Sequence, residues 1–132
     1  MKLLTFVLCV AALLPEQEVR FVAVDLYADT AGKPLVAWQI ELQCDAKIVG
    51  VEGGEKPPYY DPAALQGGRI ILASFTTDPN PPAGRVLVAR VHLQETGKTD
   101  STAKYTATLM AAASPGGARI EPKIEIIRAG GK

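Results

Sequence analysis

The segment from Val36 to Cys44, VAWQIELQC, constrains the fold more than any other part of the chain. Its large apolar residues alternate strictly with alanine, glutamine and glutamate, so a two-residue period places Trp38 at the centre of one apolar face. A helix would scatter both sets around its circumference. The segment is therefore predicted to be a β-strand with one face in water, which is typical of antiparallel sheets.

The rest of the chain repeats this pattern in short stretches that Gly- and Pro-rich turns separate. We expect one helical turn, which starts at Pro62 and has Asp61 as its N-cap. A turn is expected over residues 29–34, where Gly32 and Pro34 occur. Besides the Trp38 strand, strands are predicted over residues 19–28, 47–51, 69–77, 85–94, 104–112 and 119–128. In the strand over residues 85–94, Val86, Val88, Arg90 and His92 are expected to face outward.

This succession of strands predicts an all-β fold, a two-sheet antiparallel β-sandwich of jelly-roll or immunoglobulin-like type. The long excursion between Val51 and Arg69 carries several prolines and glycines, so we expect it to cross from one sheet to the other. The sandwich is predicted over residues 19–128, and a frayed tail over residues 129–132.

The N-terminus has a different composition. Residues 1–15 begin with Met1 and Lys2, continue as an apolar run that only Thr5 interrupts, and end at Pro15. This layout is typical of a secretory signal, and the run is too short for an ordinary transmembrane helix. We therefore expect an export segment and a periplasmic, cell-surface or extracellular protein. An uncleaved N-terminal membrane tether and a buried element of the mature fold remain open alternatives.

Charge and composition exclude several classes of function. The formal net charge is zero and no two basic residues are adjacent, which argues against a nucleic acid partner. The only histidine, His92, lies on the predicted wet face of its strand, and no Gly-x-Ser-x-Gly or His-Glu-x-x-His motif occurs. Cys44 shares the apolar face of Trp38 and is expected to be an inert core residue. We therefore expect no enzymatic activity and no cofactor.

Metal binding has one weak candidate. Asp78 and Asn80, in TTDPNPP, offer oxygen ligands for calcium, but Ca²⁺ requires six or more oxygens. Asp-Pro-Asn is also a common turn sequence, so no metal site is predicted.

Three stretches together resemble the cohesin family, the scaffold modules that bind dockerins in cellulosomes, and the related carbohydrate-binding sandwiches. The stretches are PLVAWQIELQCDAKIVGVEGG, GGRIILASFTTDPNPPAGRVLVARVHLQ, and the segment from Tyr105 to Ile126. The resemblance implies a cohesin-type sandwich, and as partner a dockerin-like domain or another exported protein.

Two sets of residues are candidates for binding. Tyr59 and Tyr60, held between prolines, are the candidates for stacking against a polysaccharide. The polar residues of two outward strand faces are the candidates for a protein interface, namely Gln39, Glu41, Gln43, Arg90 and His92. The leading hypothesis is a non-catalytic module for protein–protein or cell-surface adhesion. A carbohydrate-binding module and a structural envelope protein are the alternatives, and the oligomeric state stays open.

Overall fold

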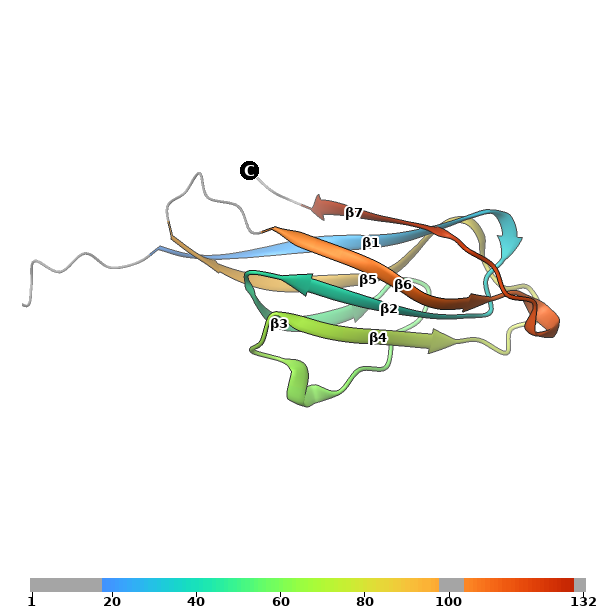
Figure 1. Cartoon of the computed structure of the whole chain (residues 1–132), viewed down its shortest axis with the longest axis horizontal. Helices are drawn as coiled ribbons and strands as arrows, with labels where there is room; N and C mark the ends of the chain where they lie inside the picture. The colour runs from blue at the N-terminus through green and yellow to red at the C-terminus, as the bar shows by residue number, and fades with distance from the viewer. Residues whose placement is uncertain (1–17, 98–103, 130–132) are drawn as a thin grey trace, which may run out of the picture.

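The computed structural model describes residues 18–97 and 104–129, and these residues form two antiparallel sheets (Figure 1). The strands are β1 (Val19–Pro34), β2 (Ala37–Cys44), β3 (Lys47–Gly53), β4 (Arg69–Phe75), β5 (Ala83–Thr96), β6 (Tyr105–Ala113) and β7 (Lys123–Ala129). Short 3-10 turns lie at η3 (Pro62–Ala64) and η4 (Pro115–Gly117). The predicted two-sheet, all-β class is confirmed. The predicted export segment, residues 1–15, and residues 130–132 of the predicted tail lie outside the described residues.

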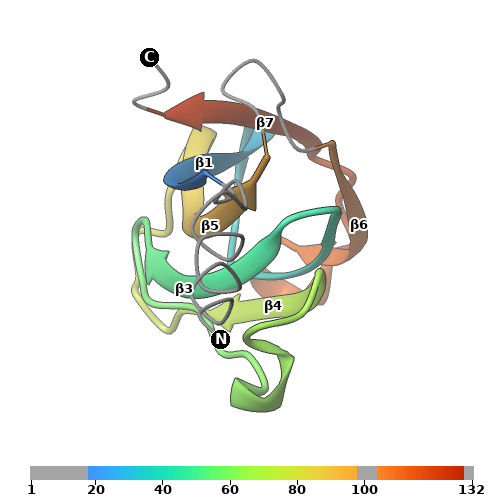
Figure 2. The same cartoon turned by 90° about the vertical axis from the view of Figure 1, so that its left-hand side faces the viewer.

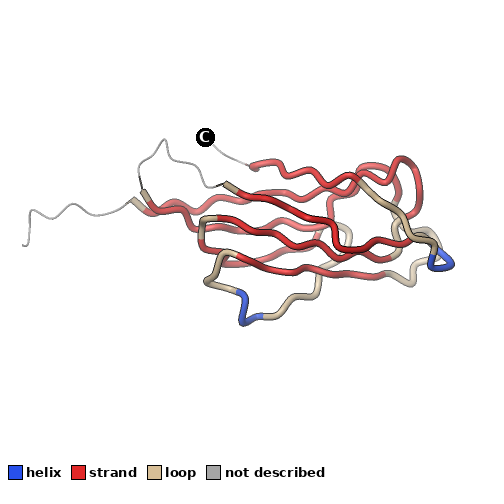
Figure 3. Tube along the Cα trace, viewed as in Figure 1, coloured by secondary structure: helices blue, strands red, loops and turns tan. Residues whose placement is uncertain are grey.

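One sheet has the strand order β3-β5-β1-β7 and the other the order β4-β2-β6. Figure 2 shows the two sheets from one end of the molecule. Because β3 and β4 belong to different sheets, the excursion between them crosses the sandwich, as predicted. It contains the predicted helical turn, η3, where the Asp61 carboxylate accepts a 2.9 Å hydrogen bond from the Ala63 N–H (Figure 3). No helix in the described ranges is long and apolar enough to span a bilayer.

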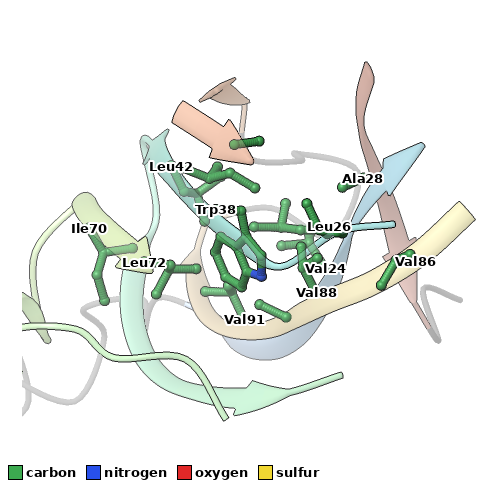
Figure 4. Close-up of a cluster of buried hydrophobic side chains, with 14 of the residues drawn as sticks. Val24, Leu26, Ala28, Trp38, Leu42, Ile70, Leu72, Val86, Val88 and Val91 are labelled. Carbon is green, nitrogen blue, oxygen red and sulfur yellow. The ribbon is translucent and has the colours of Figure 1, made fainter. Parts of the chain in front are cut away.

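The core lies between the sheets and is centred on Trp38, which is 8% exposed. Its indole lies among aliphatic side chains from both sheets (Figure 4). Ile40 and Leu42, which follow Trp38 at two-residue steps, are fully buried. The alternation in VAWQIELQC therefore predicted the buried face of β2 correctly.

The outward placement of Val86 and Val88 is wrong, because both side chains are buried. Leu26 of β1 pairs with Ala89, but Tyr27 pairs with Leu87, so Val88 is an extra residue in β5. Such a β-bulge shifts the alternation by one residue, and the two halves of β5 therefore point opposite sets of side chains inward. Val91 and Leu93, beyond the bulge, are buried as predicted.

Two other predicted boundaries also differ from the structure. The turn expected over residues 29–34 lies within β1, where Ala31 and Gly32 have φ values of 55° and 87° and Pro34 still pairs with Ala83. The last predicted strand is divided between the sheets. Arg119 bridges to Ala113 of β6, and β7 starts only at Lys123, after the chain has passed to the other sheet.

Residues 54–60, which we call the crossing strap, run from the end of β3 to the edge of β4. The Glu55 N–H donates to the Leu87 carbonyl at 3.2 Å, and Tyr59 exchanges two backbone hydrogen bonds with Ala73 of β4. The strap starts at Gly54, where a β-carbon would lie only 1.7 Å from the Leu87 carbonyl oxygen. Only glycine fits this close approach of two backbones.

Replacing Gly54 by alanine is therefore expected to destabilise the protein by about 1–3 kcal/mol, because the strap must move away from β5. Gly50 provides a matched control in β3, the strand that precedes the strap, since a β-carbon there would meet its nearest atom, in His92, at 3.9 Å. Urea denaturation of both variants measures the difference. Equal stability of Gly54→Ala and Gly50→Ala would show that the strap is not held this closely.

Candidate binding face

The exposed aromatic side chains of the strap and of β4 lie together on the outer face of the β4-β2-β6 sheet. Alternation along β4 turns Leu72 and Ser74 inward and leaves Phe75 outward, 56% exposed. Tyr59 bridges to Ala73 and is 65% exposed. Residues directly opposite each other in an antiparallel pair point to the same face of the sheet, so the Tyr59 side chain lies on the outer face with Ala73. The bridge itself adds Tyr59 to the edge of the sheet beyond β4. The Tyr59 ring stacks on that of Phe75, with centroids 6.0 Å apart and planes inclined by 11°.

Small residues and one methionine surround this pair. The register between β2 and β6 shifts next to Gln39, where Met110 is an extra residue of β6. Met110 is exposed, and the Gln39 amide donates to its sulfur at 3.5 Å. We call this surface the aromatic platform; it comprises Tyr59, Phe75, Met110, Gln39, Ala37, Ala73 and Ala111. Because the alanine side chains are short, the rings of Tyr59 and Phe75 and the Met110 side chain protrude from the aromatic platform.

A hollow of about 370 Å³ adjoins the platform. It lies between Lys56, Pro57 and Pro58 of the strap and the end of β4 at Phe75. Continuing the antiparallel register from Tyr59 and Ala73 would place Pro57 opposite Phe75. Proline has no N–H to donate, so the ladder stops after one bridge and the strap diverges from β4. The volume is in the range of sites for small ligands.

A second, smaller pocket of about 90 Å³ lies next to the hollow and reaches the edge of Trp38. Ser74, which lines both spaces, is a buried residue whose hydroxyl makes no hydrogen bond within residues 18–97 and 104–129. No fully buried side-chain N or O atom in these ranges lacks a partner, so the Ser74 hydroxyl retains some contact with solvent. The residues that line the hollow therefore carry two hydroxyls (Ser74 and Thr77), the Lys56 ammonium and two exposed rings.

The structure separates the two tyrosines that the sequence proposes for stacking. Tyr59 lies on the platform, whereas Tyr60 is half-buried and packs against the core. Phe75, which the sequence analysis did not select, takes the place beside Tyr59. The alternation of β4 could have predicted that Phe75 faces outward. It could not have predicted that Tyr59 lies beside Phe75, because the backbone bridge responsible links two different segments of the chain.

The five proposed interface residues also divide between two faces. Gln39, Glu41 and Gln43 lie on the outer face of β2, where Glu41 forms an ion pair with Arg69 of β4. Arg90 and His92 lie on β5, on the outer face of the other sheet. The two sets therefore face away from each other and do not form one site. Only the β2 set is continuous with the aromatic platform.

Charged side chains form pairs across the outer face of the β3-β5-β1-β7 sheet. Arg90 makes a bidentate pair with the buried Asp25, at 2.7 and 3.0 Å, and this hydrogen bonding raises the pKa of the Arg90 guanidinium. His92 pairs with Glu52. No group of three His, Cys, Asp or Glu side chains in the described ranges is placed to hold a metal ion. These pairs join neighbouring strands, which is an ordinary stabilising role in a sheet.

The remaining candidates have structural partners. The Asp78 carboxylate accepts a hydrogen bond from the Asn80 N–H at 3.1 Å, so it caps the turn in which calcium ligands were considered. The Cys44 thiol lies 3.3 Å from the Ala46 carbonyl, and its partial burial raises the pKa of the thiol. A raised pKa leaves less thiolate at neutral pH, which agrees with an unreactive cysteine.

An ion cluster in which Arg20 and Arg128 surround the buried Glu95 is the main feature that sequence reasoning missed. Glu95 is 3% exposed and makes a bidentate pair with Arg128 at 2.7 and 2.9 Å, and Arg20 lies 3.5 Å from the same carboxylate. Hydrogen bonding to Glu95 raises the pKa of Arg128. The cluster lies on the inner face of the β3-β5-β1-β7 sheet, at the end where β1 begins. Each of the three residues occupies the next inward position beyond the alternating apolar residues of its own strand, β1, β5 or β7, so this pattern could have located the cluster.

The fold and the platform define a two-sheet antiparallel β-sandwich with an exposed aromatic face. Comparisons with protein-family models, with curated proteins and with solved structures found no match for this chain.

Proposed function

We propose that this chain is a non-catalytic, exported binding module of cohesin-like type, which mediates protein–protein or cell-surface adhesion through the aromatic platform. The two-sheet architecture supports the proposal, as does the resemblance of the stretches that form β2 to β5. The layout of residues 1–15 supports export.

The observation that carries the proposal is the exposed Tyr59–Phe75 pair on a face of small residues. Exposed aromatic residues that are grouped on one face mark interaction sites, and aromatic residues are enriched among those that dominate binding energy. The Glu41–Arg69 pair borders the platform and provides a polar rim. Such a face suits a dockerin-like domain or another exported protein that presents an apolar patch of its own.

Alanine substitutions on the two faces test this proposal. Phe75→Ala is expected to weaken retention of a partner from the exported proteins of the source organism by at least about tenfold, the effect of a moderate hot spot. His92→Ala, on the opposite face, is the matched control and is expected to leave retention unchanged. Calorimetry with the recovered partner measures both. A loss with His92→Ala and none with Phe75→Ala would move the interface to the other sheet and refute the proposal.

Polysaccharide binding is the second candidate, and the hollow beside the platform favours it. Aromatic rings with adjacent hydroxyl and ammonium groups can contact both the apolar and the polar sides of a sugar. Affinity electrophoresis in gels that contain soluble glucans or cell-wall polysaccharide distinguishes this candidate from the first. Retardation that Tyr59→Ala abolishes and His92→Ala preserves would favour sugar. Unretarded wild-type protein would exclude these polysaccharides.

A structural envelope protein held by an uncleaved N-terminus is the third candidate. Mass spectrometry of the protein recovered from its source separates this possibility from export with cleavage. An intact N-terminus in the membrane pellet supports a tether, and a chain that lacks the first residues and is found outside the membrane supports a processed module.

A further inference from the structure

The two sides of the sandwich differ in how their edge strands are covered. On one side, the segment between β3 and β4 covers both edges. The Ile48 N–H donates to the Gly67 carbonyl at 2.8 Å, the Gln66 N–H donates to the Ile48 carbonyl at 2.7 Å, and Tyr59 pairs with Ala73. Ile48, Ile70 and Leu72 behind this cover are at most 1% exposed.

On the other side, β6 and β7 are edge strands that no ladder joins (Figure 2). Among residues 18–97 and 104–129, the outer edge of β6 is covered only at its end, where the Ile120 N–H donates to the Ala112 carbonyl at 3.1 Å and Arg119 bridges to Ala113. From Tyr105 to Ala111, no backbone hydrogen bond on that edge is made within the described ranges. Ala112 of β6 is buried, but the other residues of β6 and β7 that pack against the core are only half-buried: Tyr105, Ala107, Leu109, Ile124 and Ile126.

The two edge strands on this side, β6 and β7, differ in their content of charged residues. β7 carries Lys123, Glu125 and Arg128, and charged side chains are the usual protection of an edge against pairing with another chain. β6 reads YTATLMAAA and contains no Asp, Glu, Lys, Arg, His or Pro. The open part of this edge, Tyr105–Ala111, is seven residues without charge or proline and is a ready template for strand addition.

We propose that β6 is the interface between two copies of this chain, which pair through antiparallel β6 strands about a twofold axis. A second copy is the occupant that the charge pattern favours, because two uncharged β6 strands place no like charges opposite each other. Lys104 precedes the strand, and an antiparallel pairing puts the two lysines at opposite ends.

The pairing has a geometric consequence for the binding face. A twofold axis between antiparallel strands of one sheet is perpendicular to that sheet, so the β4-β2-β6 sheets of both copies join into one. The two aromatic platforms then lie on the same side of the joined sheet. Two linked sites on one face strengthen binding to a multivalent surface without any new contact.

Lysine substitutions at the edge test the interface. Thr106 and Thr108 are exposed on the outer face of β6, so Thr106→Lys with Thr108→Lys adds charge at the edge without entering the core. Sedimentation equilibrium of the wild-type chain is expected to show twice the single-chain mass at micromolar concentration. The double variant is expected to dissociate at least about tenfold more readily, because four lysines then face one another across the axis.

A double variant with the same added charge, Ala63→Lys with Thr77→Lys, lies on the β4 side of the sheet and is the matched control. It is expected to sediment like the wild type, and circular dichroism verifies that each variant is folded. A monomeric wild type overturns the proposal, as does an association that the Thr106 and Thr108 substitutions leave unchanged. As a second measurement, amide exchange over residues 105–111 is expected to slow as protein concentration rises. Exchange that does not depend on concentration contradicts pairing through β6.

Discussion

Replacing Glu95 by alanine is expected to lower the free energy of unfolding by about 3–5 kcal/mol, the range for removing one partner of a buried ion pair. Glu95 is 3% exposed and is the shared carboxylate of Arg128 and Arg20. Without it, two guanidinium groups remain near each other on the inner face of a sheet. The loss therefore comes mainly from leaving the Arg128 guanidinium without its bidentate carboxylate beside a second cation, and less from the absence of one attractive contact.

Urea denaturation measures this effect, and Glu125→Ala is the matched control. Glu125 pairs with Arg85 at 3.1 Å, but both side chains are more than a third exposed to water. An exposed pair of this kind contributes less than about 1 kcal/mol. Glu95→Gln, which keeps hydrogen-bonding atoms but removes the charge, is expected to fall between Glu95→Ala and the wild type. Equal effects of Glu95→Ala and Glu125→Ala would show that the cluster is not buried in solution.

Replacing Trp38 by alanine is expected to cost about 3–5 kcal/mol, because it removes the largest side chain from a closely packed core and leaves a cavity. The indole lies between the two sheets. Ile40 and Leu42, its neighbours on β2, are fully buried and already packed, so they cannot move to fill the cavity. Trp38→Phe keeps most of the volume and is expected to retain much of the lost stability. Thermal unfolding monitored by circular dichroism compares the two variants.

Trp38 is the only tryptophan of the chain, so wild-type fluorescence provides an independent measurement. Burial predicts an emission maximum at short wavelength that moves to longer wavelength on unfolding. An emission maximum of a water-exposed indole in the native protein would contradict the core that Figure 4 shows.

Local alternation was a reliable guide wherever one strand stayed paired in one register. It identified the buried face of β2 and the inward residues of the second half of β5, and the capping preferences of Asp and Pro identified the Asp61 cap of η3. It failed at Val86 and Val88, because a bulge is defined by the partner strand and not by the strand that contains it. It also missed Glu95 and Arg128, since apolar patterning passes over charged residues even when they occupy the inward positions.

The binding face depended on pairings between distant segments. Tyr59 and Phe75 were each visible in the sequence, but only the backbone bridge between Tyr59 and Ala73 places their rings together. In the same way, the sequence suggested one interface from β2 and β5, and the assignment of these strands to different sheets divided it.

The sequence by itself determined the class of fold, because a two-residue period forces one side of each strand to be apolar and two such sheets must pack together to exclude water. Only the tertiary structure decided which exposed side chains are neighbours, which edges are covered and which charges are buried. These properties depend on strand order and register, and both are set by contacts between residues far apart in the chain, which no local pattern records.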